Sequence, residues 1–252
     1  MAQKIRVGAV SYLNTKPLIY GFEQGMMADQ VELVYDYPAN IAAQLLNGEI
    51  DAGLVPVAVI PSLGEYHIIS DHGIGSDGEV ASVCLFSDVP LGDIETVLLD
   101  YQSRTSVALL KWLLKEHWKI APVLVQGTAS YEERIGGNTA GLVIGDRAFK
   151  QRLRSTYIYD LGAAWKEMTG LPFVFAAWIS NKELPQKFID DFNVANERGL
   201  QEIDKVIDAA GGSDYDLRKY YTQNINYTMN EKSREGLRLF LEQTRAEVTG
   251  IG

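Results

Sequence analysis

The sequence predicts an α/β protein built as two lobes. Short runs rich in β-branched residues alternate with helical segments from residue 4 to residue 179, a pattern typical of sheets whose strands are linked by crossover helices. A polar break that holds a proline and a glycine, residues 88–92, divides this alternation into two series. From residue 184 onward the pattern is helical. We therefore expect two βα lobes and a C-terminal helical region that completes the first of them.

The first series covers residues 4–87. Strands are expected at 4–10, 30–36, 51–57, 66–70 and 79–87, and helices or helical turns at 16–20, 38–47 and 57–63. Residues 71–78 carry three glycines and two aspartates, so we expect a flexible loop there. The βαβαβ order implies parallel strands.

The second series begins after the polar break. Strands are expected at 96–99, 122–125, 140–144, 157–159 and 173–179, and helices at 105–118, 131–136, 147–153 and 161–169. Three helices, at 185–209, 215–223 and 231–249, are expected to follow without a further strand. Because the chain leaves near residue 89 and returns near residue 178, two connections join the lobes. We expect residues 1–88 plus 180–252 to form lobe one and residues 89–179 to form lobe two, with a ligand cleft between them.

The composition excludes several classes of function. The 252 residues include 23 Lys and Arg against 33 Asp and Glu, a formal charge of −10, which argues against a nucleic-acid or anionic-membrane partner. Cys84 is the only cysteine, so no internal disulfide or Cys-rich metal site can form. The three histidines show no metal-ligand spacing, and we expect no metal. The opening residues lack the apolar core of a signal peptide, and no run of eighteen apolar residues occurs, so we expect a cytoplasmic protein.

The turn after the first strand is the first candidate site. Ser11, Tyr12 and Asn14 follow a strand and precede a helix, which places them at the carboxyl edge of a sheet. Ligands of open α/β sheets bind at that edge. The amide of Asn14 offers a donor and an acceptor, so it can orient a substrate without carrying charge. The alternative is that Asn14 and Thr15 only cap the helix.

Two further strand-to-helix turns carry polar groups. Ser103, Arg104, Thr105 and Ser106 stand at a helix start, where free N–H groups, the helix dipole and three hydroxyls suit a carboxylate or a phosphate. The alternative is that Ser103 is simply an N-cap. Asp146 occupies the equivalent place after another strand, and it either makes a polar contact across the cleft or caps the next helix.

Several of these segments resemble one known family. The opening stretch Gly8-Ala9-Val10-Ser11-Tyr12-Leu13-Asn14-Thr15-Lys16-Pro17-Leu18 resembles the first motif of the chorismate dehydratases of the futalosine route to menaquinone. Later blocks that resemble that family follow in the same order: Asp51-Ala52-Gly53-Leu54-Val55-Pro56-Val57, Val80-Ala81-Ser82-Val83 and Ser103-Arg104-Thr105-Ser106. The resemblance covers nearly the whole chain and is weakest in the terminal helices.

The resemblance implies a type II periplasmic-binding-protein fold used by an enzyme. The implied reaction is loss of water from chorismate to give 3-[(1-carboxyvinyl)oxy]benzoate, without a cofactor. The family's catalytic asparagine and serine correspond to Asn14 and Ser82. The substrate would be a small dicarboxylate, and the protein a monomer or a homodimer. No strong base stands in these motifs, so our hypothesis is that a carboxylate of the substrate takes the proton.

Three other functions remain open from the sequence. A non-catalytic solute-binding protein would share the fold, and it usually carries an export signal or a lipid anchor. The sister enzyme of the route, 1,4-dihydroxy-6-naphthoate synthase, relies on a histidine. None of the three histidines here lies in a convincing cleft motif. A transcriptional effector-sensing domain would need a helix-turn-helix, which we do not find.

Overall fold

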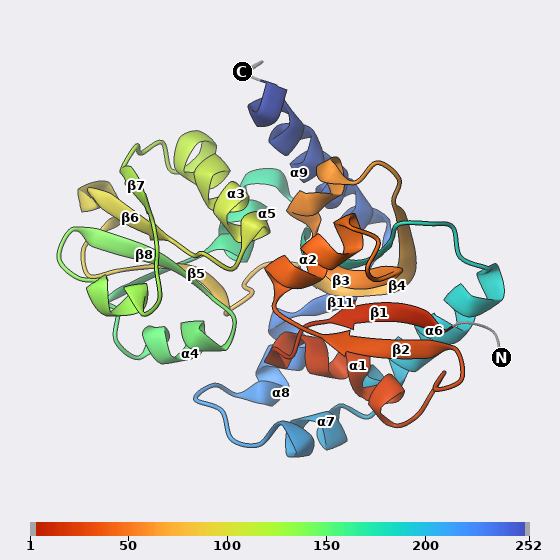
Figure 1. Cartoon of the computed structure of the whole chain (residues 1–252). Coiled ribbons are helices and arrows are strands. Elements are labelled where there is room, and N and C mark those ends of the chain that lie inside the picture. Colours follow the sequence, from red (N-terminus) through yellow and green to blue (C-terminus); the bar gives the residue numbers. More distant parts are fainter. Residues whose placement is uncertain (1–3, 250–252) are drawn as a thin grey trace.

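Two mixed sheets organise the chain (Figure 1). The computed structural model describes the backbone of residues 4–249 and the side chains of residues 4–244. The larger sheet has the strand order β11-β4-β10-β3-β1-β2, and the smaller sheet has the order β7-β6-β8-β5-β9. In Figure 1 the smaller sheet and its helices α3, α4 and α5 lie to the left of the larger sheet. The predicted α/β class with two lobes is confirmed.

The larger sheet takes strands from both ends of the chain. Its strands are β1 (Ile5–Ala9), β2 (Val31–Tyr35), β3 (Ala52–Pro56), β4 (His67–Ser76), β10 (Phe173–Ser180) and β11 (Asn226–Thr228). Its helices are α1 (Lys16–Glu23), α2 (Pro38–Leu46), α6 (Gln186–Gln201), α7 (Ile203–Ala210), α8 (Leu217–Lys219) and α9 (Glu231–Thr249). β1 pairs in parallel with β2 and β3, as the βαβ pattern predicts, whereas β10 runs antiparallel between β3 and β4.

The smaller sheet is built from the middle of the chain. Its strands are β5 (Val83–Ser87), β6 (Thr96–Leu99), β7 (Val123–Gln126), β8 (Thr139–Ile144) and β9 (Tyr157–Asp160), and its helices are α3 (Arg104–Trp112), α4 (Asp146–Arg152) and α5 (Leu161–Thr169). β6 pairs in parallel with β7 and β8, and β5 runs antiparallel to β8 and β9. No helix within residues 4–249 is long and apolar enough to cross a bilayer.

The two connections between the sheets lie earlier in the chain than the predicted boundaries. β5 belongs to the smaller sheet and β10 to the larger one. A division by sheet therefore falls within 77–82 and 170–172, instead of at 88/89 and 179/180. We propose that the lobe boundaries lie within residues 77–82 and 170–172. Residues 1–3 and 250–252, which the sequence assigns to lobe one, lie outside the described residues.

The glycine-rich segment 71–78 is largely a strand, so its prediction as a flexible loop is wrong. β4 continues to Ser76 and is paired on both sides, with β10 and β11. A Cβ built on Gly75 would lie 2.5 Å from the carbonyl oxygen of Phe173, so glycine permits the close approach of the neighbouring strand. The expected absence of a strand after residue 184 is also wrong, because β11 pairs with the glycine-containing part of β4.

Replacing Gly75 with alanine tests this reading of β4. The added methyl group collides with backbone, which cannot move as a flexible side chain can, so we expect Gly75→Ala to lower the free energy of unfolding by roughly 1–3 kcal/mol. The matched control is Gly64→Ala, because Gly64 is exposed and its added Cβ meets nothing within 4 Å. Denaturant titration of both variants measures the difference. Equal stability of the two variants would contradict the close strand pairing.

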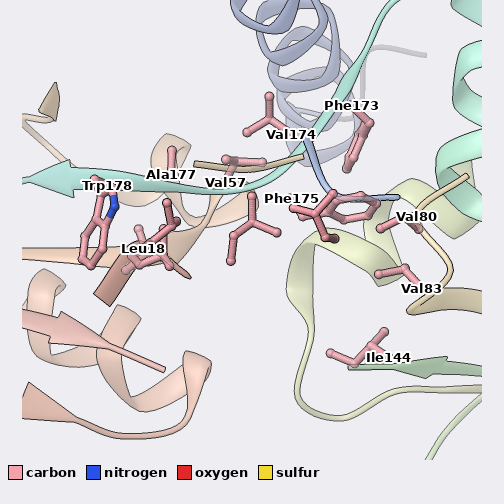
Figure 2. Packing of buried hydrophobic residues seen from close by; sticks show 14 of the residues in the cluster. Leu18, Val57, Val80, Val83, Ile144, Phe173, Val174, Phe175, Ala177 and Trp178 are labelled. Carbon is pink, nitrogen blue, oxygen red and sulfur yellow. The ribbon is translucent and has the colours of Figure 1, made fainter. Parts of the chain in front are cut away.

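The apolar core runs without interruption from one lobe into the other. Figure 2 shows Phe173 and Phe175 of β10 beside Val80 and Val83, which lie where the chain crosses into the smaller sheet. All four side chains are at least nine-tenths buried and belong to one cluster that also holds Ile144 of β8. The burial of these side chains against both lobes fixes the place where the lobes meet, and the candidate site lies there.

Candidate active site

One cavity lies between the lobes and encloses about 650 Å³, including the part open to solvent. Its larger-sheet side comes from the turn after β1, from β3, β4 and β10, and from the start of α2. Its other side comes from the crossing segment, the end of β8 and the starts of α3 and α4. The lining residues are Val10, Tyr12, Asn14, Thr15, Pro38, Leu54, Pro56, Ile74, Val80, Ser82, Val83, Gln102, Ser103, Thr105, Ser106, Ile144, Gly145, Phe175 and Ala176. Apolar walls with a few placed polar groups are typical of sites for small organic ligands.

The turn after β1 joins the two lobes. The hydroxyl of Tyr12 donates to Oε1 of Gln102 at 2.7 Å, and the N–H of Leu13 donates to Oδ1 of Asp146 at 3.3 Å. Asn14 directly follows Tyr12 and Leu13, and its carbonyl accepts from the hydroxyl of Tyr227 at 3.0 Å. The backbone of Asn14 is therefore held in place while its side chain lines the cavity.

Ser82 lies in the segment 77–82 that crosses between the sheets. Its side chain is 1% exposed, and its Oγ accepts from the hydroxyl of Tyr220 at 2.7 Å. Ala81 has a left-handed backbone with φ of 64°, which turns the chain sharply just before Ser82. The half-buried carboxylate of Asp160 holds this turn by accepting from the N–H groups of Val80 and Ala81 at 3.0 and 2.7 Å.

The start of α3 faces the cavity with hydrogen-bond donors. Ser103 is its N-cap: its Oγ accepts from the N–H of Ser106 at 3.1 Å, and its hydroxyl donates to Oγ of Ser106 at 2.8 Å. The hydroxyl of Ser106 therefore keeps its own proton for another partner. The first N–H groups of a helix have no partner inside the helix, so those of Arg104 and Thr105 add donors and positive dipole at this edge. A carboxylate fits this corner of the cavity.

A second polar network lies behind Gln102. Arg147 donates to Oδ2 of Asp100 at 2.6 Å, to Glu132 at 2.5 Å and to Oε1 of Gln102 at 3.3 Å. Burial raises the pKa of Asp100, and the guanidinium of Arg147 opposes that shift. The charge of Arg147 is thus shared between two carboxylates, and its role here is to hold Gln102, which in turn accepts from Tyr12.

The structure brings most of the predicted site residues together. Lining the cavity are Tyr12, Asn14, Ser82, Ser103, Thr105 and Ser106. Ser11 and Arg104 are exposed and do not line it, and Asp146 lies outside the lining, where it accepts from Leu13 across the lobes. The capping interpretation of Ser103 is correct, because its Oγ accepts from the N–H of Ser106, and Ser103 also lines the cavity. Its expected role in binding an anion stays a prediction.

Four residues at the site were missed by the sequence analysis. Gln102 immediately precedes the Ser103 motif, so its place in the sequence could have indicated that it belongs to the site. Gly145 lines the cavity with φ of 63°, and its only signal is a glycine after a strand. Tyr220 and Tyr227 lie in the C-terminal region, and nothing in the local pattern connects them with residues 14 and 82.

The lining residues contain one titratable side chain, that of Tyr12. Burial raises the pKa of Tyr12 to about 12, so it keeps its proton at neutral pH. Within the part of the chain that the structure describes, no group of three or more His, Cys, Asp or Glu side chains is arranged to hold a metal ion. The cavity can therefore orient a ligand and donate hydrogen bonds to it, and its lining offers no ordinary side-chain base at neutral pH.

Solved structures share this architecture. A protein of Archaeoglobus fulgidus matches with a TM-score of 0.75 at 17% identity, over 99% of this chain and 98% of that one. A Candida albicans protein described as having the generic periplasmic binding protein fold gives 0.63 at 13%, over 98% and 95%. The periplasmic aliphatic sulphonate binding protein of Escherichia coli gives 0.62 at 12%, over 99% and 94%. The chain is thus a two-lobed protein of the periplasmic-binding-protein fold, with a cavity between its lobes.

Sequence relatives narrow this class to one family. The family described as menaquinone biosynthesis matches residues 5–246. A relative from Thermus thermophilus named chorismate dehydratase is 30% identical, over 94% of this chain and 93% of its own length. A relative from Campylobacter jejuni with the same name is 27% identical, over 95% and 97%. This chain belongs to the menaquinone biosynthesis family, and the resemblance stated from its motifs is confirmed.

Proposed function

We propose that this protein is a chorismate dehydratase, which converts chorismate to 3-[(1-carboxyvinyl)oxy]benzoate and water. The names of the two relatives support the reaction. The observation that carries the proposal is the cavity itself, where Asn14 and Ser82 lie together beside the donor-rich start of α3. The solute-binding and naphthoate-synthase alternatives have no comparable support.

The reaction needs no covalent bond between the protein and the substrate. The ring carbon that bears the enolpyruvyl ether loses its proton, the neighbouring carbon loses its hydroxyl, and the electron pair completes an aromatic ring. Proton plus hydroxyl leave as water, so no oxidant or reductant is needed. The protein contributes by holding the ring in one orientation, excluding solvent and donating hydrogen bonds to the departing hydroxyl. Asn14 and Ser82 are the proposed donors.

A carboxylate of the substrate is the proposed base. Tyr12 is the one titratable side chain in the lining, and with a pKa of about 12 it is protonated and cannot accept the proton. The enolpyruvyl group that carries this carboxylate is joined through its ether oxygen to the carbon that loses the proton. The proton transfer is therefore intramolecular, and intramolecular reactions gain from such proximity. The other carboxylate is proposed to bind at Ser106 and the first turn of α3.

The pH dependence of turnover tests this assignment of the base. We expect kcat/KM to be constant from pH 7 to pH 9. The substrate carboxylates are ionised throughout that range, and Tyr12 keeps its proton because its pKa is raised from the ordinary 10 to about 12. A histidine base with an ordinary pKa near 6.5 would make turnover rise through neutral pH. A steady-state profile with a limb between pH 7 and pH 9 would contradict the proposal.

The function is tested by incubating the purified protein with chorismate, without added metal or cofactor, and following the mixture by chromatography and mass spectrometry. We expect chorismate to be replaced by a single product lighter by one water. Saturable binding without any product would support a solute-binding protein instead.

The expected cytoplasmic location and the monomeric or homodimeric state stay predictions. Cell fractionation checks the location, and size-exclusion chromatography with light scattering checks the oligomeric state.

A further inference from the structure

Two tyrosines of the C-terminal region reach the two proposed catalytic residues. Tyr220 hydrogen-bonds Oγ of Ser82 at 2.7 Å, and Tyr227 donates to the carbonyl of Asn14 at 3.0 Å. Both side chains are buried, and both belong to the segment from α8 to β11. This segment lies more than 130 residues from Ser82 in the sequence, as the separation of 138 between Tyr220 and Ser82 shows.

The chemistry of the two hydroxyls sets the direction of the Tyr220–Ser82 hydrogen bond. A phenol is far more acidic than an alkyl hydroxyl, so the tyrosine is the better donor. Burial raises the pKa of Tyr220 well above its ordinary value, and the hydroxyl therefore keeps its proton at every working pH. Oγ of Ser82 accepts this hydrogen bond on one lone pair, which leaves its own O–H to be donated elsewhere.

The backbone of Ser82 is fixed on both sides. Its N–H donates to the carbonyl of Val80 at 2.8 Å, and its carbonyl accepts from the N–H of Gly145 at 2.8 Å. The backbone of Ser82 is fixed, and its Oγ is held by Tyr220. The direction left for its hydroxyl proton is toward the cavity that Ser82 lines. Without the phenol, the hydroxyl of Ser82 could rotate and its proton would be shared among several orientations.

We propose that Tyr220 is a positioning residue: by donating to Oγ of Ser82, it makes Ser82 a permanent hydrogen-bond donor to the substrate in the cavity. The proposal rests on the proposed function and deepens it, because it assigns the polarity of one catalytic hydrogen bond. Ser82 then donates to an oxygen of the dicarboxylate substrate that gains negative charge as water leaves, and it does not act as a base.

The neighbouring tyrosine supplies a matched control. Tyr221 is as deeply buried as Tyr220, at 3% against 0% exposure, but among the described residues its hydroxyl has no hydrogen-bond partner. Removing an unpartnered buried hydroxyl costs no hydrogen bond. Tyr220→Phe and Tyr221→Phe therefore remove the same atom from adjacent buried rings, and only the first removal breaks a contact with Ser82.

The test is steady-state turnover of chorismate by the wild-type protein, Tyr220→Phe and Tyr221→Phe, with thermal unfolding to verify that each is folded. We expect Tyr220→Phe to lower kcat by roughly tenfold, the loss of one modest hydrogen bond in the transition state, with KM changed less than twofold. Tyr221→Phe should match the wild type. In a Ser82→Ala background, Tyr220→Phe should cause no further loss of kcat, because its partner is gone.

The outcomes separate the two proposals. An inactive wild-type protein would overturn the proposed function. An active wild-type protein with an unchanged Tyr220→Phe variant would overturn the role of Tyr220 alone. Equal losses in both Phe variants, or the same tenfold loss in the Ser82→Ala background, would show that the tyrosine stabilises the fold without acting through Ser82.

Discussion

Replacing Asn14 with alanine is expected to lower kcat for chorismate by about 100- to 1,000-fold, the range found when one preorganised donor to developing charge is removed. Asn14 lines the cavity, and its backbone is fixed by Tyr227, so its amide is held where a reacting substrate would lie. The variant keeps the backbone carbonyl that Tyr227 contacts. We therefore expect the fold to persist and the loss to fall on turnover, as steady-state kinetics will measure.

Asn40→Ala is the matched control for that change. Asn40 is exposed on α2, where its amide donates to Asp36 at 2.8 Å, and it does not line the cavity. Its removal deletes an amide of the same size from the same lobe, and turnover should stay within about twofold of the wild type, as expected for a surface substitution. An Asn14→Ala variant as active as Asn40→Ala would remove Asn14 from the catalytic machinery.

The second large effect concerns the substrate. Chorismate whose enolpyruvyl carboxylate is converted to a neutral amide is expected to bind in the cavity and to show no measurable turnover, because the proposed base is gone. Binding is measured by calorimetry and turnover by chromatography. The amide keeps the shape and hydrogen-bonding capacity of the group, so affinity should fall by a smaller factor than turnover.

The analogue with the ring carboxylate amidated is the control for this experiment. That group is proposed to bind at the start of α3, so its neutralisation should weaken binding while slow turnover survives. Equal loss of binding and turnover with the enolpyruvyl amide would count against the substrate base. Undiminished turnover of the enolpyruvyl amide would exclude the enolpyruvyl carboxylate as the base.

Helices and strands with strong local patterns were predictable from the sequence, and long-range pairing was not. The strand at 96–99 and the helix at 161–169 lie where the apolar pattern placed them. The glycines of β4 carry no strand propensity, and only the close approach of β10 and β11 explains them. The segment 79–87 was expected as one strand, but Ala81 turns left-handed and Asp160 holds the turn, so β5 starts at Val83.

The candidate site was predictable where its residues form a local motif. Tyr12 and Asn14 follow a strand, and Ser103 to Ser106 open a helix, so sheet-edge geometry brings them into one cavity. Ser82 was placed by the family resemblance, since its own pattern indicated only a strand. Tyr220 reaches Ser82 across 138 residues, and such a contact depends on how the C-terminal segment packs. The hydrogen bond that Ser82 accepts from Tyr220 could therefore be found only from the fold.

The crystal structure of the Asn14→Ala variant with chorismate would show whether the substrate binds in this cavity, because this variant should bind chorismate without consuming it. We expect intact chorismate between the lobes, with one carboxylate within hydrogen-bond distance of Ser106 and the first turn of α3. Its enolpyruvyl carboxylate should lie beside the carbon that loses the proton, and Ser82 should contact the substrate. Chorismate bound elsewhere, or an empty cavity at saturating chorismate, would contradict the assignment of this cavity as the dehydratase site.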